Sequence, residues 1–340
     1  MMANLRRIAF IGLTSLLGCT LALAAPKPLH IYAVDVEGGQ ATLLVSPSGK
    51  SLLVDTGWPG FNGRDADRIV AAAKTAGIKK IDYLVVTHYH RDHVGGVEQL
   101  AQRIKIGTFV DHGPNQEDSD VTREDFGNYQ KVIAHAHHKV VKPGDRIPVK
   151  GLSVQVLAAA GEHIASALPG AGQPNPYCAG EPQAVADPTE NARSVGMLVI
   201  YGKFRFLDLG DLTKQKELEL VCPNNLIGTV DLYLVTHHGM DLSNDKALVD
   251  VVHARAAIMD NGAHKGGSPA AWQTVHDAPG MQDLWQLHYA AEAGKEHNSP
   301  EQFIANLGET DAGHDIEVTA EPDGSFTVLN TRNGFKKTYK

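Results

Sequence analysis

The stretch that decides the fold is Thr87-His88-Tyr89-His90-Arg91-Asp92-His93-Val94-Gly95-Gly96. It follows directly after residues 81–86, an apolar run with the composition of a buried strand. The stretch is therefore the loop in which that strand ends, and its glycine pair allows the chain to turn into a helix. Imidazole nitrogens and carboxylate oxygens are the ligands that zinc and similar divalent ions prefer. Burying four such groups without an ion would be costly, so the sequence predicts a metal site here.

The N-terminus, residues 1–25, has the pattern of a secretory signal peptide. Arg6 and Arg7 precede an apolar run, and Ala22-Leu23-Ala24 is a small-residue cleavage signal. The alternative is lipidation at Cys19, because Leu16-Leu17-Gly18-Cys19 resembles a lipobox. Both readings predict an exported protein, periplasmic or secreted. No segment of the mature sequence is apolar over a length that would span a membrane, so we expect no transmembrane segment there.

The charge and cysteine content of the mature chain narrow its partners and its compartment. Without Arg6 and Arg7, 29 basic residues stand against 39 acidic ones, a net charge of −10. This balance disfavours a nucleic-acid groove, although a local basic patch would not be visible in the total. Cleavage also leaves two cysteines, Cys178 and Cys222. In an oxidising compartment such a pair favours a disulfide, and two buried free thiols are the alternative.

The pattern along residues 26–340 predicts a single domain with a core at about 29–265 and a C-terminal extension at about 266–340. Apolar runs and turn residues predict strands and helices throughout the core. Strands are expected near 29–36, 41–45, 51–54, 81–86, 105–110, 152–158, 196–200, 204–211, 230–236 and 256–259. Helices are expected near 64–76, 95–103, 212–220 and 244–253, and a loop and a helix within 114–139. The tail is expected to hold one or two helices and a closing hairpin near 315–330. Residues 164–190 are rich in Pro, Gly and Ala and predict a surface excursion.

The two halves of the core repeat each other. Residues 49–57 match residues 202–210 without a gap, and residues 82–88 match residues 231–237 with a histidine at the same offset. Two related β-β-α-β units imply two sheets face to face with helices outside. Strand ends of both halves would then meet at one edge, where their polar groups can share an ion.

These motifs resemble the metallo-β-lactamase-fold hydrolase superfamily. The resemblance rests on His88-x-His90-x-Asp92-His93, on Gly210-Asp211 and on His237-His238-Gly239, and it covers residues 29 to 265. The chain is most similar to the branch that contains the soluble lobe of competence DNA-uptake channel proteins and the bacterial phosphorylcholine esterases. That branch shares the opening at Asp35-Val36-x-x-Gly39-Gln40 and the pair Asn191 and Ser194. The implied fold is a four-layer αββα sandwich with two related halves.

The resemblance implies a site for two zinc ions, although other first-row divalent metals fit the same ligands. His88 and His90 would hold one ion with a third histidine, and Asp92 and His93 would hold the other with a late histidine. Asp211 would bridge both ions, which makes Asp92 and Asp211 the catalytic carboxylates. The alternative role for Asp211 is to cap a helix.

Two ligands stay open in the sequence. The usual Gly-His-Thr context of the third histidine is missing, and the candidates are His163, favoured by its place before Asp211, and His112. The late ligand is His237, which mirrors His88, or His238 as an alternative ligand or supporting group. A further cluster, His135, His137 and His138, lies in a polar stretch that reads as a surface helix.

The expected function is that of an exported zinc-dependent hydrolase. Its metal-bound hydroxide would attack a phosphodiester or another small cell-envelope ester. Lys265 and Asn261, in a Gly-rich turn after an apolar run, are candidates for binding the substrate, and the alternative for Lys265 is an ordinary exposed lysine. The alternative functions are a periplasmic nuclease, a β-lactam or lactone hydrolase, and a metal-binding module without catalysis.

Overall fold

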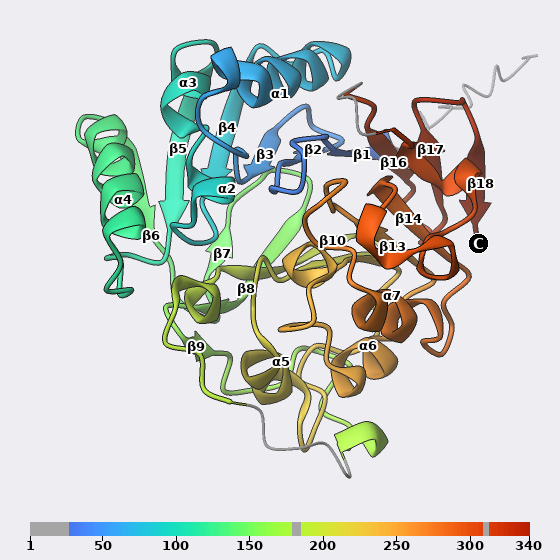
Figure 1. The fold of residues 1–340 in the computed structure, drawn as a ribbon. Helices are drawn as coiled ribbons and strands as arrows, with labels where there is room; N and C mark the ends of the chain where they lie inside the picture. The colour runs from blue at the N-terminus through green and yellow to red at the C-terminus, as the bar shows by residue number, and fades with distance from the viewer. Residues whose placement is uncertain (1–26, 179–184, 309–312) are drawn as a thin grey trace, which may run out of the picture.

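The computed structural model describes residues 27–178, 185–308 and 313–340. The predicted signal peptide and Cys19 lie outside these residues. Within the described ranges the strands form two nine-stranded sheets that pack face to face, and helices cover both outer faces (Figure 1). This is the four-layer αββα sandwich predicted from the sequence. No helix in the same ranges is long and apolar enough to cross a membrane.

The strands follow a simple spatial order in each sheet. The first sheet consists of β18 (Lys336–Tyr339), β17 (Phe326–Asn330), β16 (Ile316–Ala320), β1 (Leu29–Ala33), β2 (Thr42–Val45), β3 (Ser51–Val54), β4 (Lys80–Val85), β5 (Lys105–Asp111) and β6 (His137–Val140). The second sheet consists of β15 (Ile304–Asn306), β14 (Asp283–His288), β13 (Ala256–Met259), β12 (Leu232–Leu234), β11 (Phe204–Asp208), β10 (Gly196–Tyr201), β8 (Ser153–Ala159) and β7 (Arg146–Ile147), with β9 (Glu162–His163) beside β8.

The helices divide between the two outer faces (Figure 1). The first sheet carries α1 (Arg64–Thr75), α2 (Arg91–Val94), α3 (Val97–Ala101) and α4 (Asp120–Ile133). The second sheet carries α5 (Lys214–Val221), α6 (Lys246–Val252) and α7 (Pro269–His276). Short 3-10 turns are η1 (Phe61–Gly63), η2 (Pro176–Cys178), η3 (Glu190–Arg193), η4 (Thr236–Gly239), η5 (Ala291–Ala293), η6 (Lys295–His297) and η7 (Glu301–Phe303).

Alternating side chains on the central strands build three apolar layers. On β3, Leu52 points into the core between the sheets, whereas Leu53 packs under the helices of the first sheet. On β10, Met197 points into the same central core, whereas Leu198 packs under the helices of the second sheet. Strands that are buried on both faces have continuous apolar runs, which explains why these segments were predictable.

The predicted internal repeat is present in the fold. In the first half, β2 and β3 pair antiparallel, α1 follows, and β4 returns parallel to β3. In the second half, β10 and β11 pair antiparallel, α5 follows, and β12 returns parallel to β11. The polar stretches that follow β4 and β12 therefore occupy equivalent positions in the two halves.

The C-terminal residues complete both sheets. β14 and β15 extend the second sheet beyond β13. β16 pairs antiparallel with β1, and β16 and β17 form the predicted closing hairpin. The sequence did not predict β14, β15 or β18, because these short strands are set by pairing with neighbours that are distant in the chain.

Two local expectations had different outcomes. His137 and His138 are exposed as expected, but they lie in the edge strand β6 and not in a helix, because residues 137–140 pair with β5. The disulfide prediction is confirmed, since Cys178 and Cys222 are bonded. It ties the excursion at residues 164–178 to the C-terminal end of α5.

Candidate metal centre

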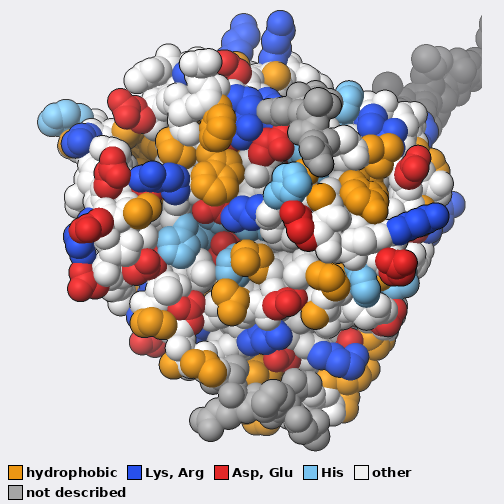
Figure 2. Space-filling view, viewed as in Figure 1, with side chains coloured by type: hydrophobic (Ala, Val, Ile, Leu, Met, Phe, Trp, Pro, Cys, Tyr) orange, Lys and Arg blue, Asp and Glu red, His pale blue; other side chains and the backbone are white. Residues whose placement is uncertain are grey.

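The predicted metal-binding stretches of the two halves meet at one edge of the sandwich. His88 to His93 follow β4, Asp211 follows β11, and His237 and His238 lie in η4, directly after β12. On this face, Figure 2 shows histidine, acidic and basic side chains gathered in a hollow near the centre of the view. The cluster therefore forms where the internal repeat places the carboxyl ends of equivalent strands.

Four buried residues make the tighter half of this cluster. Their candidate ligand atoms all lie within 4.8 Å of one another, and the residues are Asp92, His93, Asp211 and His238. Nε2 of His93 is 3.3 Å from Oδ2 of Asp92 and 3.2 Å from Oδ2 of Asp211. Nε2 of His238 is 3.3 Å from Oδ2 of Asp92 and 3.6 Å from Oδ1 of Asp211. Two imidazoles and two carboxylates at this spacing match the ligand set of a divalent ion.

Two further imidazoles approach Asp211. Nε2 of His237 is 3.4 Å from Oδ2 of Asp211, and Nε2 of His88 is 3.8 Å from the same oxygen. Nε2 of His88 and Oδ1 of Asp211 are buried and have no hydrogen-bond partner among the described residues. Buried polar atoms normally have a hydrogen-bond partner. An imidazole nitrogen and a carboxylate oxygen that both lack one, in neighbouring residues, are typical of a site that binds a cation.

The local backbone at His237 and His238 is strained. Both residues have left-handed conformations, with φ of 56° and 54°. This conformation costs a residue with a side chain about 1–2 kcal/mol. The N–H of His237 donates to the carbonyl of Gly210 at 3.0 Å, and the N–H of Gly267 donates to the carbonyl of His238 at 2.8 Å. Strain of this kind clusters at functional sites, and here it turns two consecutive imidazoles toward one carboxylate.

The outer nitrogens of His93 and His238 face carboxylates. Nδ1 of His93 is 2.7 Å from Oδ2 of the buried Asp55. Nδ1 of His238 is 3.3 Å from Oδ1 of Asp260. Histidines that bind metals are usually oriented by such a partner on the other nitrogen. In both residues Nε2 is consequently the nitrogen that faces the cluster.

Hydroxyl groups orient His237 and His88 in the same way. Nδ1 of His237 is 3.1 Å from Oγ of Ser243. Nδ1 of His88 is 3.0 Å from Oγ1 of Thr87. Both imidazoles therefore present Nε2 to Asp211, and four of the cluster's imidazoles share one orientation.

His90 is oriented with the opposite nitrogen. Its Nε2 lies 2.9 Å from Oε2 of Glu117, in the loop before α4, which leaves Nδ1 available on the other side of the ring. Its ring centroid lies 4.7 Å from that of His88. The same oxygen of Glu117 accepts the N–H of Glu190 at 2.9 Å, so the carboxylate is fixed from a second side. His90 is thus held beside the cluster by a residue that the sequence motif did not indicate.

The protonation states of Asp211, Asp92 and His88 suit metal binding. Burial alone would raise the pKa of Asp211, but the surrounding imidazoles hold it well below its usual range. Burial acts in the same way on Asp92, where Lys265 and His93 keep the pKa well below its usual range. Burial lowers the pKa of His88 well below its usual value, so this imidazole is neutral. Ionised carboxylates and a neutral imidazole are the protonation states that a metal ligand requires.

Three residues expected at the site lie elsewhere. His163, the favoured third histidine, sits in β9 with Nδ1 3.4 Å from Glu219 on α5, and about a third of its side chain is exposed. His112, the alternative, is buried with Nε2 2.9 Å from Glu190. Asn261 is fully buried, and its side-chain amide donates to the backbone within its own turn and to β14, which leaves no group for a substrate. The structure instead brings His237 and His238 together at Asp211.

A second group of possible ligands forms ion pairs within the protein. It consists of Asp35, Glu37 and His288. Nε2 of His288 lies 2.7 Å from Oδ1 of Asp35, and Nη1 of Arg68 lies 3.2 Å from Oδ2 of the same carboxylate. A guanidinium at this position supplies the positive charge that an ion would bring. We therefore assign this group to an ion-pair network that connects the loop after β1 with β14.

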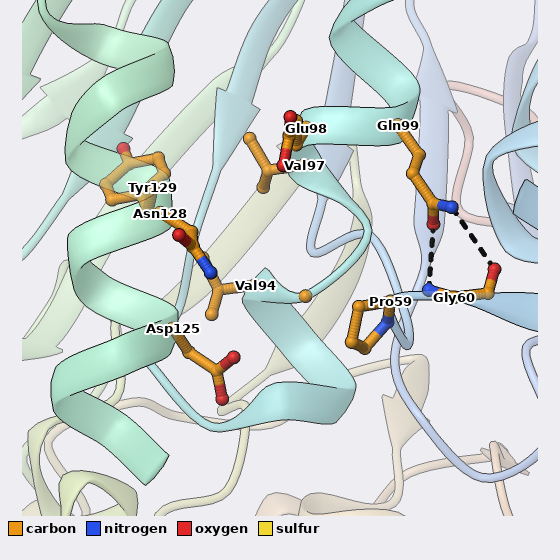
Figure 3. Close-up of a pocket in the computed structure, with 10 residues that line it drawn as sticks. Pro59, Gly60, Val94, Val97, Glu98, Gln99, Asp125, Asn128 and Tyr129 are labelled. Carbon is orange, nitrogen blue, oxygen red and sulfur yellow. Dashed lines mark hydrogen bonds between the residues drawn. The ribbon is translucent and has the colours of Figure 1, made fainter. Parts of the chain in front are cut away.

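A small cavity of 180 Å³ lies beside the cluster, between α2, α3 and α4 (Figure 3). Its lining contains none of the cluster's metal-ligand candidates. Gln99 spans its rim and makes two hydrogen bonds with Gly60, at 3.1 and 3.2 Å. These bonds fix the loop at residues 58–60, and the ring centroid of Trp58 in the same loop lies 5.4 Å from Nζ of Lys265.

The sandwich and the cluster at its strand ends define an α/β protein with a candidate metal centre. Residues 34–169 match the model of the Metallo-beta-lactamase superfamily. These residues, which carry the motif at His88 to His93, match that superfamily as the sequence predicted. Members of that superfamily are mostly metal-dependent hydrolases, in agreement with the predicted enzyme class.

Three curated relatives illustrate the similarity. The chain is 26% identical over 235 residues to Recombination protein 2 of Haemophilus influenzae, across 68% of this chain and 24% of that protein. It is 26% identical over 194 residues to ComE operon protein 3 of Bacillus subtilis, across 55% and 20%. It is 32% identical over 100 residues to a hydroxyacylglutathione hydrolase of Rhodopseudomonas palustris, across 29% and 32%. The first two match the predicted branch, and the chain spans a quarter or less of their length.

Proposed function

We propose that this chain is an exported zinc-dependent hydrolase that acts on a phosphodiester or a related small ester of the cell envelope. The observation that carries the proposal is the approach of four imidazoles to the carboxylate of Asp211. Nε2 of His93, of His88 and of His237 lies 3.2–3.8 Å from Oδ2, and Nε2 of His238 lies 3.6 Å from Oδ1. A carboxylate has two oxygens and can serve two ions at once.

The residues fit two ions that share Asp211 and otherwise have different ligands. Asp92, His93, His238 and Asp211 would hold one ion, and the other would be held by the set His88, His90, His237 and Asp211. Imidazole and carboxylate ligands without thiolates favour zinc or a neighbouring first-row metal. When bound, such a pair lowers the pKa of a water molecule to near neutrality and polarises the substrate oxygen. His237 fills the place for which the sequence had offered His163 or His112.

The chain's own groups prepare the site for this chemistry. Asp92 and Asp211 stay ionised, and they place negative charge where cations must sit. Asp55 and Glu117 fix the ring orientation of His93 and His90, so little reorganisation is needed when an ion enters. The partly exposed ammonium of Lys265 stands at Asp92 and supports an anionic substrate.

Export is supported by the disulfide and by the N-terminal sequence pattern. Cys178 and Cys222 are bonded, and disulfides persist in oxidising compartments. The N-terminal pattern of Arg6, Arg7 and an apolar run is that of a cleaved leader. A nuclease is the second candidate, favoured by the similarity to Recombination protein 2, but the acidic net charge disfavours a long nucleic-acid groove.

The test combines metal analysis with a substrate panel. We expect purified protein to carry close to two first-row ions per chain and to hydrolyse bis-p-nitrophenyl phosphate faster than a β-lactam, a lactone or DNA. Asp211→Asn removes the shared charge, and we expect loss of metal and a fall in turnover of about 100-fold or more. Protein that stays free of metal in zinc-containing buffer would refute the proposal, and preferred cleavage of DNA would select the nuclease.

A further inference from the structure

Lys265 reaches the metal cluster from a part of the chain that the motifs do not include. It lies in the turn after β13, in the second half of the chain, yet its ammonium contacts the carboxylate of Asp92 in the first half. It also donates a hydrogen bond to the carbonyl of Gly38 at 2.6 Å and stands 5.4 Å from the ring centroid of Trp58. A lysine ammonium is therefore in contact with a predicted metal ligand.

The ammonium is held in place by its turn. The N–H of Gly262 donates to the carbonyl of Lys265 at 2.8 Å, which closes the turn. The turn rests directly on the first half, since a Cβ on Gly38 would lie 2.7 Å from the nitrogen of Gly262. Gly38 has φ of +78°, which also favours glycine. The backbone that carries Lys265 is therefore fixed against the mouth of the site.

The ammonium and a metal ion would require the same oxygen. Lys265 contacts Oδ2 of Asp92, and this oxygen is also the one that lies 3.3 Å from Nε2 of His93 and from Nε2 of His238. An ion held by those two nitrogens would take up Oδ2. Like charges at this distance repel, so the ammonium must then move away from Asp92.

An ammonium displaced from Asp92 would move toward the solvent. The side chain of Lys265 is 29% exposed, whereas that of Asp92 is 11% exposed, so the lysine is on the solvent side of the carboxylate. Its bonds to Gly38 and its place above Trp58 keep it near the cluster. A cation at the mouth of the site, beside the position of the ion, suits an anionic oxygen of a substrate.

We propose that Lys265 competes for Asp92 with the metal ion that Asp92, His93 and His238 would hold. Once this ion has displaced it, Lys265 holds an anionic oxygen of the substrate. The proposal rests on the proposed function and narrows its substrate class to esters with a charged oxygen beside the scissile bond. A phosphoryl oxygen and a carboxylate share this chemistry. The lysine therefore couples occupancy of the ion site to recognition of an anionic substrate.

The first experiment measures metal affinity alone. Zinc is titrated against a chromophoric chelator in the wild-type protein and in Lys265→Met, Lys265→Arg and Lys50→Met. Loss of the competing charge should tighten binding of the weaker zinc ion about tenfold in Lys265→Met and leave Lys265→Arg near wild type. Lys50→Met is the matched control, because Lys50 pairs with Asp82 at 3.0 Å at the opposite end of the strands. Unchanged or weaker zinc binding in Lys265→Met would overturn the proposal.

The second experiment measures selectivity at saturating zinc. In Lys265→Met we expect kcat/KM for bis-p-nitrophenyl phosphate to fall about tenfold and that for the neutral p-nitrophenyl acetate to change less than about twofold. Inhibition by inorganic phosphate and by succinate then separates the phosphoryl source from the carboxylate source. An equal fall for both esters, with inhibition by both anions unchanged, would contradict the proposal. If the wild type cleaves neither ester, the proposed function fails, while the zinc titration and phosphate-induced thermal shifts still decide the role of Lys265.

Discussion

Nε2 of His93 lies 3.1 Å from Nε2 of His238, so the two halves of the chain meet nitrogen to nitrogen. Burial and Lys265 oppose protonation of His238, but Asp211 and Asp260 outweigh them and raise its pKa to about 10. Burial also opposes protonation of His93, and the carboxylates around it raise its pKa well above the usual value. Two nitrogens at this distance can share one proton in an N–H···N hydrogen bond, and that proton occupies the place of a cation.

Metal binding should therefore release protons. An ion that takes both Nε2 atoms must displace the shared proton, since a ligating nitrogen has no hydrogen. At pH 7 we expect about one proton to be released for each ion that binds between His93 and His238. Calorimetric titrations with zinc in two buffers of different ionisation enthalpy measure this number. Zinc binding without proton release would show that the pair does not hold a proton.

His237 and His238 should separate the two ions. His238 belongs to the shell with Asp92 and His93, whereas His237 approaches Asp211 beside His88. We expect His238→Ala and His237→Ala each to reduce the metal content from about two ions to about one. The double variant His237→Ala, His238→Ala should bind almost no metal.

Cobalt substitution distinguishes which ion each variant retains, because the two shells have different ligands. His163→Ala is the control, since His163 pairs with Glu219 outside the cluster, and it should keep the full metal content. Loss of an ion in that control would restore His163 as a ligand.

Glu117 should act on one ion through His90. Its carboxylate holds Nε2 of His90 at 2.9 Å, and partners of this kind typically contribute 10- to 100-fold to metal affinity. We expect Glu117→Ala to weaken the ion held by His88 and His90 by about that factor and to leave the other ion unchanged. Glu98→Ala, an exposed glutamate on α3, is the control. Equal weakening of both ions would indicate a general structural defect.

Glu217 should make the protein less stable as pH rises. It is fully buried on α5, and its two oxygens accept the N–H groups of Asn244 and Asp245 at 2.9 and 2.7 Å. Burial raises its pKa to about 8, against an ordinary value of 4.5. Between these values the unfolded chain has lost the proton and the folded protein still binds it. The contribution of Glu217 to the free energy of unfolding therefore decreases with rising pH between about 4.5 and 8 and levels off above.

Glu217→Gln tests this dependence. The variant cannot titrate and loses one of the two hydrogen bonds, so it should start about 1–3 kcal/mol less stable and show a flatter pH profile. Urea unfolding of metal-free protein from pH 4 to 9 gives both profiles, and their difference isolates Glu217. Glu301→Gln, at an exposed position, should follow the wild type. Parallel profiles for Glu217→Gln and the wild type would contradict the raised pKa.

The disulfide should stabilise the fold without touching the metal centre. Cys178 and Cys222 are 44 residues apart, and closing a loop of this size contributes about 2–4 kcal/mol in the chain-entropy model. We expect the double variant Cys178→Ser, Cys222→Ser to unfold at a lower temperature and to keep its full metal content. Reduced wild-type protein should behave in the same way, and a difference between the two would point to the serines themselves.

The sequence allowed the fold and half of the site to be predicted. Apolar runs precede the motif from His88 to His93, the carboxylate of Asp211 and His237. The ends of such runs can be located from hydrophobic periodicity. The repeat then predicted that these ends meet. Asp55 was also accessible in principle, because it ends a strand at the position that Asp208 occupies in the second half.

The remaining ligands depended on geometry that periodicity does not contain. The choice between His237 and His238 depends on two left-handed residues, and after such a turn the alternation of a strand no longer applies. His163 has a suitable place in chain order, but β9 pairs beside β8 and faces α5, where Glu219 contacts the imidazole. Glu117 supports His90 from a loop with no motif. Contacts of this kind arise from tertiary packing alone.

The pairing of β1 with β16 sets the order in which the protein can be assembled. Leu29, at the start of the described chain, lies opposite Ala320, so the first sheet cannot close until residues 316–320 are available to pair. Pairing across such a separation is slow, and β1 keeps an open edge while it waits. A premature stop before residue 316 would thus yield an aggregation-prone chain and not a shortened enzyme. Because Asp211 and His238 belong to the second half of the core, the predicted metal centre can form only after both halves have folded together.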